Sequence, residues 1–109
     1  ICSNDEVSYS EDSFENLKKN YFEKKMSFYY LHDKTQKIAK DFGAVCTPDF
    51  FVYDKDLRLS YRGRLDDSWK DPATVTKREL FDAVQMLENG ERPSKNQNSS
   101  MGCSIKWLK

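Results

Sequence analysis

The chain has few cysteines, prolines, glycines and histidines. It contains 3 cysteines, 3 prolines, 4 glycines and 1 histidine among 109 residues. Cys2, Cys46 and Cys103 are far apart, and their spacing matches neither a zinc site nor a disulfide framework. Because their number is odd, at least one thiol is free or pairs with another molecule. The single histidine, His32, has no Cys or Asp at ligand spacing, so we expect a loop residue rather than a base or metal ligand.

An excess of one charge and a long apolar run are also missing. The 18 basic and 18 acidic residues balance to a net charge of zero. A nucleic-acid-binding protein would carry a basic excess, so we expect no nucleic-acid partner. No segment approaches the ~20 apolar residues of a membrane span, so we expect no membrane partner. The first residues show no methionine and no signal-peptide pattern; we expect an internal start and favour a cytoplasmic location.

The length of the chain is enough for one domain with a modest core. We place this domain at residues 1–90. Residues 91–109 form a polar tail rich in Pro, Ser, Asn, Gln and Lys, with an apolar end. The pattern contains no internal repeat.

Apolar spacing predicts three helices, over most of residues 12–24, 35–42 and 77–89. The first has Phe14, Leu17, Tyr21 and Phe22 at steps of three and four, with Asp12 or Ser10 as its cap. Asp33 with Gln36 repeats the capping pattern for the second helix, and Gly43 ends it. For the third helix, Thr76–Glu79 is predicted to be a capping box.

Extended segments are predicted at 49–53 and 57–62, joined by the turn Asp54-Lys55-Asp56 into a hairpin. The aromatic run from Met26 to Leu31 is predicted to be extended and buried. Residues 63–75, with Trp69 and Pro72, are predicted to be a long polar loop. We expect Asp66 and Asp67, near Arg62 and Arg64, to form a solvated salt-bridged loop, with a functional charge cluster as the alternative.

The most informative segment is Cys46-Thr47-Pro48, directly before the aromatic strand at residues 49–53. Proline cannot donate to a strand ladder, so it belongs at the start or edge of a strand. A cysteine two residues earlier adds a thiol to this loop. Cys46 is either a buried small residue or a reactive thiol, and a disulfide with Cys103 is an open alternative. Cys2 is expected to be structural.

A series of short motifs, in this order and spacing, resembles the C-terminal part of the peroxiredoxin-like branch of the AhpC/TSA family, within the thioredoxin superfamily. They cover most of the chain: Ser3–Asp5, Ser13–Asn16, Leu31–Asp33, Thr35–Gln36, Gly43–Phe51, Tyr61–Ser68 and Gly102–Trp107. The resemblance implies an α/β thioredoxin-like fold, a cis Thr47–Pro48 peptide, and a substrate-binding role for Thr47 and Pro48. Cys46 is then a candidate thiol of the site. The Cys-x-x-Cys motif of the family is absent, so the catalytic residues are unknown.

The resemblance also implies that the N-terminal strand and first helix of the fold are missing. In the family this strand lies centrally in the sheet, so the gap would be completed by a homodimer or by strand or helix exchange. The alternative is a compact monomer in which the residues before Phe14 fill the gap in the sheet.

Three functions follow as expectations. In the first, the chain is part of a thiol–disulfide oxidoreductase that uses a disulfide or peroxide substrate and a thiol reductant, without a metal or other cofactor. The chain alone would then be inactive, because thiol chemistry needs an activated thiolate and a second thiol. The alternatives are a non-catalytic interaction module on a thioredoxin scaffold and a truncated reading frame without activity of its own.

Overall fold

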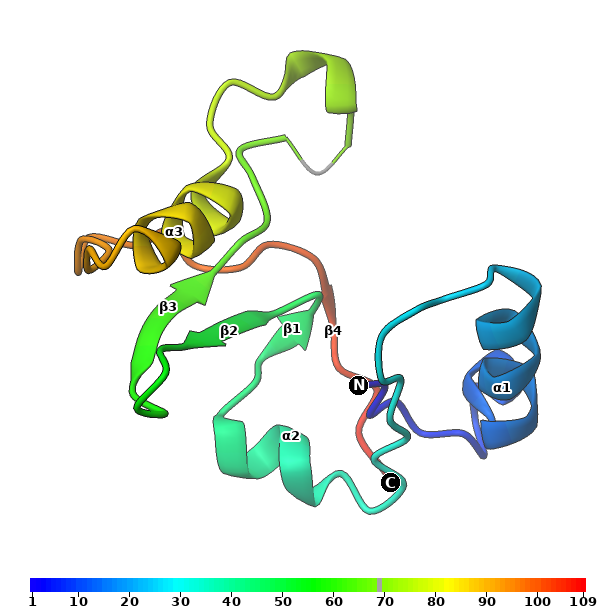
Figure 1. The fold of residues 1–109 in the computed structure, drawn as a ribbon. Coiled ribbons are helices and arrows are strands. Elements are labelled where there is room, and N and C mark those ends of the chain that lie inside the picture. Colours follow the sequence, from blue (N-terminus) through cyan, green and yellow to red (C-terminus); the bar gives the residue numbers. More distant parts are fainter. Residues whose placement is uncertain (69) are drawn as a thin grey trace. The chain divides into compact units, whose positions relative to one another are not determined.

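The computed structural model describes residues 1–68 and 70–109 and divides the chain into two compact units. Unit 1 comprises Ile1–Ala44 with Ile105–Lys109, and unit 2 comprises Val45–Ser104. Together they form a small mixed α/β protein whose described strands make two small antiparallel sheets (Figure 1). Trp69, predicted to lie in a loop, is outside the described residues.

Unit 1 contains the 3-10 turn η1 (Ser10–Asp12) and the helices α1 (Phe14–Glu23) and α2 (Lys37–Phe42), which confirms the two helices predicted there. The predicted cap of α1 is wrong, because Ser10 and Asp12 lie within η1. Ser13 caps α1 instead: its hydroxyl accepts a hydrogen bond of 3.3 Å from the amide of Asn16.

Two polar side chains hold α2 in unit 1. The Asp33 carboxylate accepts hydrogen bonds from the amides of Ile38 (3.3 Å) and Ala39 (2.9 Å), so it satisfies donors of the first turn, although Gln36 occupies the N-cap position. The side chain of Gln36 does not share in capping. Its buried amide donates to the carbonyls of Ser3 and Lys106 and accepts from the amide of Leu108, at 2.7, 2.8 and 2.9 Å. Gln36 therefore joins three segments of unit 1. The helix ends at Gly43, which has the left-handed φ of 73° that favours glycine.

Unit 2 is built around a β-hairpin. Its elements are β1 (Cys46–Thr47), β2 (Phe50–Tyr53), β3 (Leu59–Gly63), the 3-10 turn η2 (Pro72–Thr74), α3 (Glu79–Glu88) and β4 (Cys103–Ser104). Strands β2 and β3 pair antiparallel, with Phe50 opposite Gly63 and Val52 opposite Tyr61, and β1 pairs with β4. The predicted hairpin and third helix are therefore confirmed. The predicted tail is divided between the units, since residues 91–104 belong to unit 2 and Ile105–Lys109 to unit 1.

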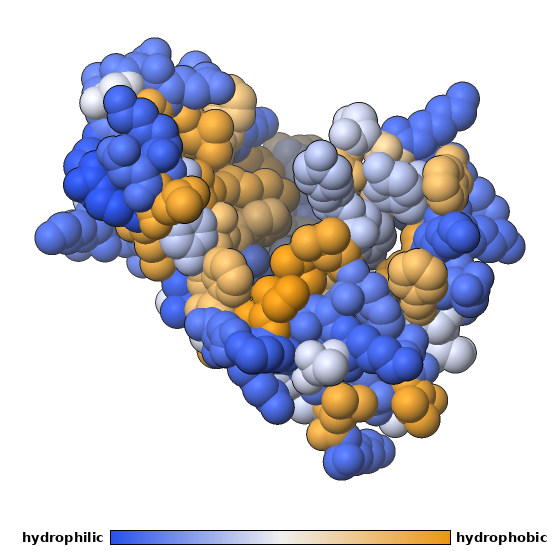
Figure 2. All heavy atoms as spheres, turned by 60° about the horizontal axis from the view of Figure 1, so that its bottom comes forward, coloured by the Kyte–Doolittle hydropathy of each residue, from blue (hydrophilic) through white to orange (hydrophobic). Residues whose placement is uncertain are grey.

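Each unit buries few apolar side chains. Leu17, Ala39 and Ile105 are buried in unit 1, and Tyr61 and Ala83 in unit 2. Many larger apolar side chains reach the surface, where Figure 2 shows them among hydrophilic residues. The predicted burial of the aromatic run is wrong, because Phe28 and Tyr29 are 61% and 93% exposed. In the described part of the chain, no helix is long and apolar enough to cross a membrane.

Candidate functional site

The three residues predicted for the site lie together in one loop of unit 2. Cys46 and Thr47 form β1, and Pro48 lies between β1 and β2. The Thr47–Pro48 peptide is cis, which confirms that prediction. We refer to residues 45–49 as the Thr-Pro loop.

Asp49 closes the Thr-Pro loop. Its side chain is 4% exposed and accepts hydrogen bonds from the amide of Val45 (3.2 Å) and the hydroxyl of Ser100 (2.7 Å). One amino group of the Arg62 guanidinium lies 3.7 Å from the same carboxylate. A single buried carboxylate thus connects the start of the loop, β3 and the C-terminal segment. Sequence reasoning missed Asp49, although an acidic residue directly after Thr-Pro at the start of an apolar strand was a visible signal.

A pocket of about 320 Å³ lies beside the loop within unit 2. Its lining residues are Val45, Asp49, Arg62, Gly63, Gln97, Ser99 and Ser100. Arg62 is also positioned over the ring of Phe51, with its guanidinium carbon 5.0 Å from the ring centre. The pocket therefore has walls of mixed polarity, in which the Arg62 guanidinium faces the Asp49 carboxylate.

Cys46 is not an activated thiol in this setting. Its Sγ donates to the Pro48 carbonyl oxygen over 3.6 Å. Partial burial raises the pKa of the Cys46 thiol, and the negative charge of Asp49 raises it further, while Arg62 opposes this. Thiol exchange requires the thiolate, which a raised pKa disfavours at neutral pH. Cys46 therefore lies in the Thr-Pro loop as predicted, but its surroundings raise the pKa of its thiol, whereas a nucleophilic cysteine needs a lowered pKa.

The other thiols do not complete a redox pair with Cys46. All three cysteines are free. In the β1–β4 pair, Cys46 is opposite Ser104 and Thr47 is opposite Cys103. Since successive side chains of a strand point to opposite faces, Cys46 and Cys103 lie on different faces of this pair, and the register does not favour a disulfide. Cys2 belongs to unit 1, where burial raises the pKa of its thiol. No three His, Cys, Asp or Glu side chains group as a metal site among the described residues.

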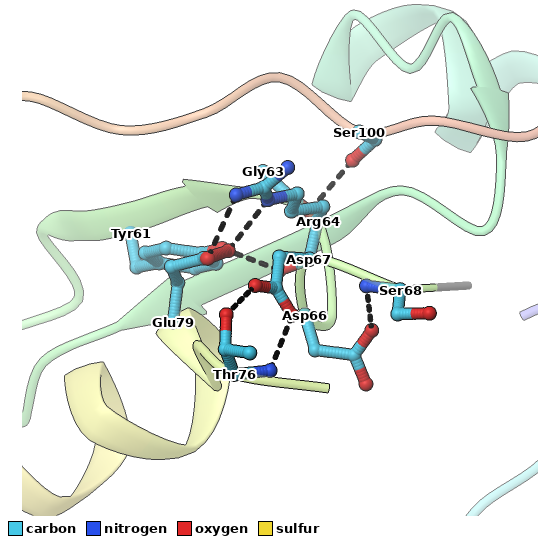
Figure 3. Close-up of polar contacts among 9 residues, drawn as sticks. All are labelled: Tyr61, Gly63, Arg64, Asp66, Asp67, Ser68, Thr76, Glu79 and Ser100. Atoms are coloured by element: carbon cyan, nitrogen blue, oxygen red, sulfur yellow. Dashed lines mark hydrogen bonds and ion pairs between the residues drawn. The ribbon is translucent and has the colours of Figure 1, made fainter. Parts of the chain in front are cut away.

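A polar network connects β3 to α3 (Figure 3). Arg64 forms a bidentate ion pair with Glu79 at 2.7 and 2.9 Å, and the buried Tyr61 hydroxyl donates to the carbonyl of Arg64. Asp67 accepts from the amide of Thr76 at 2.9 Å and from its hydroxyl. Hydrogen bonds from the Thr76 hydroxyl and amide lower the pKa of Asp67 to about 2.

This network corrects two predictions. Thr76 does not form a capping box, because its hydroxyl bonds to Asp67 and α3 begins only at Glu79. The ion pairs of the two arginines involve other carboxylates than those of Asp66 and Asp67, although the charge of Asp67 still acts on Arg64. Arg64 pairs with Glu79, and Arg62 with Asp49. The network fixes the position of α3 on the hairpin.

Residues 97–104, which we call the C-terminal strap, lie along the hairpin and the Thr-Pro loop. Gln97 bonds to the backbone of β3: its side chain accepts from the amide of Arg62 (2.9 Å) and donates to the carbonyl of Ser60 (2.9 Å). The Ser100 hydroxyl lies 2.6 Å from the carbonyl of Gly63. The strap ends in β4, paired with β1. Its composition predicted only a polar tail, and the tertiary hydrogen bonds reveal its place.

His32 is more buried than a surface loop residue. Its side chain is 10% exposed and its Nε2 lies 3.8 Å from the Glu6 carboxylate, too far for a hydrogen bond. Its ring centre lies 6.0 Å from that of Phe14. His32 is thus part of the packing of unit 1 and lies outside the candidate site.

The solved structures that are similar to this chain include two bacterial proteins. One is an uncharacterized conserved protein from Geobacillus kaustophilus, with 46% identity and a TM-score of 0.88; the match covers 97% of this chain and 57% of that one. The other is a hypothetical protein from Sinorhizobium meliloti, with 38% identity and a TM-score of 0.88. This match covers 97% of this chain and 58% of that one. This chain therefore spans little more than half the length of either. No family model and no curated protein matches the chain.

Proposed function

We propose that this chain is the substrate-binding portion of a thioredoxin-like, peroxiredoxin-like thiol–disulfide oxidoreductase. The observation that supports this most is the order within unit 2: the Thr-Pro loop leads directly into the β2–β3 hairpin, and α3 follows. A thioredoxin-like C-terminal half has this order, and the motifs that resemble the AhpC/TSA family run along the same residues. The substrate would be a disulfide or peroxide, with a thiol as reductant and no metal or other cofactor.

In this proposal the chain supplies half of the site. Thr47 and Pro48 hold the substrate through the backbone, and Asp49 keeps their loop closed. Cys46 assists binding and is not the attacking thiol, because its raised pKa keeps it protonated at neutral pH. The attacking and resolving cysteines would come from outside the 109 residues.

Turnover assays on two proteins test the proposal. One is the 109-residue chain, and the other is this chain extended by the residues that its own gene encodes before Ile1. Insulin reduction and peroxide consumption are measured with dithiothreitol as reductant. We expect turnover from the longer protein only. A longer protein without a cysteine pair and without turnover would refute the proposal, as would robust turnover of the short chain that disappears in Cys46→Ser.

The second candidate function is a non-catalytic interaction module, and the chemistry of the thiols favours it. Burial raises the pKa of both Cys2 and Cys46, so neither thiol resembles an activated nucleophile. The same assays separate the two functions. An inactive longer protein that still binds an extended peptide through the Thr-Pro loop supports the interaction module.

We also propose that the chain forms a two-fold homodimer. Unit 1 exposes a set of large apolar side chains, namely Phe14, Phe22, Phe28, Tyr29 and Leu31. Phe50 and Phe51 of β2 are only partly exposed. Burying apolar surface is worth about 25 cal/mol per Å², so a few hundred Å² matter against marginal stability. Light scattering across a dilution series should show a dimer that dissociates on dilution. A folded monomer at every concentration would refute it.

A further inference from the structure

The edge of β1 is occupied by the chain's own C-terminal strap. Cys103 and Ser104 pair antiparallel with Thr47 and Cys46, as Figure 1 shows for β4 beside β1. The Thr47 hydroxyl adds a hydrogen bond of 3.4 Å to the carbonyl of Cys103. Thr47, one of the two residues proposed to hold a substrate backbone, is therefore already paired with an extended peptide segment.

The fit at this edge depends on a glycine. A Cβ atom added at Gly102 would lie 2.2 Å from the carbonyl oxygen of Thr47 and 3.3 Å from Cδ of Pro48. Contacts below about 3 Å do not occur for real Cβ atoms, and the nearest atom belongs to backbone that cannot turn away. Only a residue without a side chain passes the Thr-Pro loop so closely.

Before Gly102, the strap is held by polar contacts to β3 and the loop. The amide of Arg64 donates to the carbonyl of Asn98 over 3.2 Å, and Ser100 lies within hydrogen-bond distance of Asp49 and Gly63. These contacts use the backbone and small polar side chains. By contrast, the side chain of Met101 is 54% exposed and takes no part in them.

We propose that the β1 edge is a binding site for extended peptides with a glycine directly before the two paired residues, and that the C-terminal strap is its built-in competitor. This inference rests on the proposed function, which assigns Thr47 and Pro48 to substrate binding. The ligand is an extended peptide that adds a strand to the sheet edge. Its main-chain hydrogen bonds provide affinity, and the narrow space at the glycine provides selectivity. An incoming peptide must displace the strap, whose covalent connection gives it an effective concentration of about millimolar.

A labelled peptide tests the competition. The probe is a fluorescent peptide with the sequence of residues 97–104 carrying Cys103→Ser, so that no disulfide can form. Binding is measured by fluorescence anisotropy with the wild-type chain, Gly102→Val and the control Met101→Ala. We expect Gly102→Val, whose strap no longer fits, to bind the probe at least about tenfold more tightly than wild type. Met101→Ala should bind like wild type, and a probe that itself carries Gly102→Val should bind to none of them.

Nuclear magnetic resonance of the wild-type chain keeps the test decisive if Gly102→Val does not fold. Unlabelled probe at millimolar concentration should shift the amide resonances of Cys46, Thr47, Cys103 and Ser104. Unchanged resonances would overturn the inference, and so would a folded Gly102→Val chain that binds no better than wild type. Because no readout involves thiol turnover, failure here is distinct from failure of the oxidoreductase proposal.

Discussion

Removing the Asp49 carboxylate should open the Thr-Pro loop at a calculable cost. In Asp49→Ala, the amide of Val45 and the hydroxyl of Ser100 both lose a charged acceptor. Hydrogen bonds to charged groups contribute about 1.5–3 kcal/mol each. Val45 is 66% exposed, so water can reach this part of the loop, and Ser100 still has the carbonyl of Gly63 at 2.6 Å. The cost per bond therefore lies at the lower end of this range.

The ion pair adds little, since Arg62 is 41% exposed and 3.7 Å from the carboxylate. Partly exposed pairs contribute about 0–1 kcal/mol. The expected loss in the free energy of unfolding is thus about 2–4 kcal/mol, a large part of the 5–15 kcal/mol typical of small domains. Asp49→Asn keeps one acceptor oxygen, so we expect about half of this loss.

Urea unfolding followed by circular dichroism measures the loss. Asp56→Ala is the matched control, because its carboxylate is 60% exposed and lies 3.5 Å from Arg58; it should change stability by no more than about 0.5 kcal/mol. A second readout is alkylation of Cys46, whose pKa should fall when the negative charge of Asp49 is removed. A loss for Asp49→Ala no greater than that of Asp56→Ala would refute the assignment of Asp49 as the closing residue.

Three further predictions concern single side chains. Gln36→Leu removes three buried hydrogen bonds and should cost about 2–4 kcal/mol in urea unfolding, whereas the exposed Gln85→Ala should be nearly neutral. The pKa of Asp67 is lowered from 3.8 to about 2, so its contribution is complete above about pH 4 and is lost as the pH falls towards 2; acid unfolding of Asp67→Asn should lack this step. Because the pKa of Cys46 is raised above 9.0, its alkylation rate, measured by mass spectrometry, should still increase above pH 9, and a plateau by pH 8 would contradict the assigned environment.

The local pattern of the sequence predicts most of the secondary structure correctly. The helices α1, α2 and α3 and the β2–β3 hairpin follow from apolar spacing and turn residues, and Gly43 ends α2 as predicted. These features depend on residues a few positions apart. The cis peptide before Pro48 was predicted from the resemblance to the thioredoxin superfamily, and the structure has it.

The features that were missed depend on long-range contacts. Thr76 has the sequence of a capping residue, but its hydroxyl bonds to Asp67, nine residues earlier. Gln36 looked like part of a cap, yet its partners include Lys106, seventy residues away. The aromatic run around Tyr29 looked like core, but neither small unit offers it a buried place. In the first two cases a tertiary partner overrides a local preference, and in the third the units are too small to bury the run.

The Thr-Pro loop is better suited to holding a backbone than to activating a thiol. Its one buried charge is the negative carboxylate of Asp49, which raises the pKa of Cys46, whereas a nucleophilic cysteine requires positive potential nearby. The same carboxylate accepts a hydrogen bond from the amide of Val45, and so keeps β1 in position to pair with another strand. Asp49 thus disfavours the thiolate of Cys46 and at the same time maintains the β1 edge. A site of this kind would need its attacking thiol on another segment. The turnover assays test for that thiol, and the peptide probe tests binding at the β1 edge.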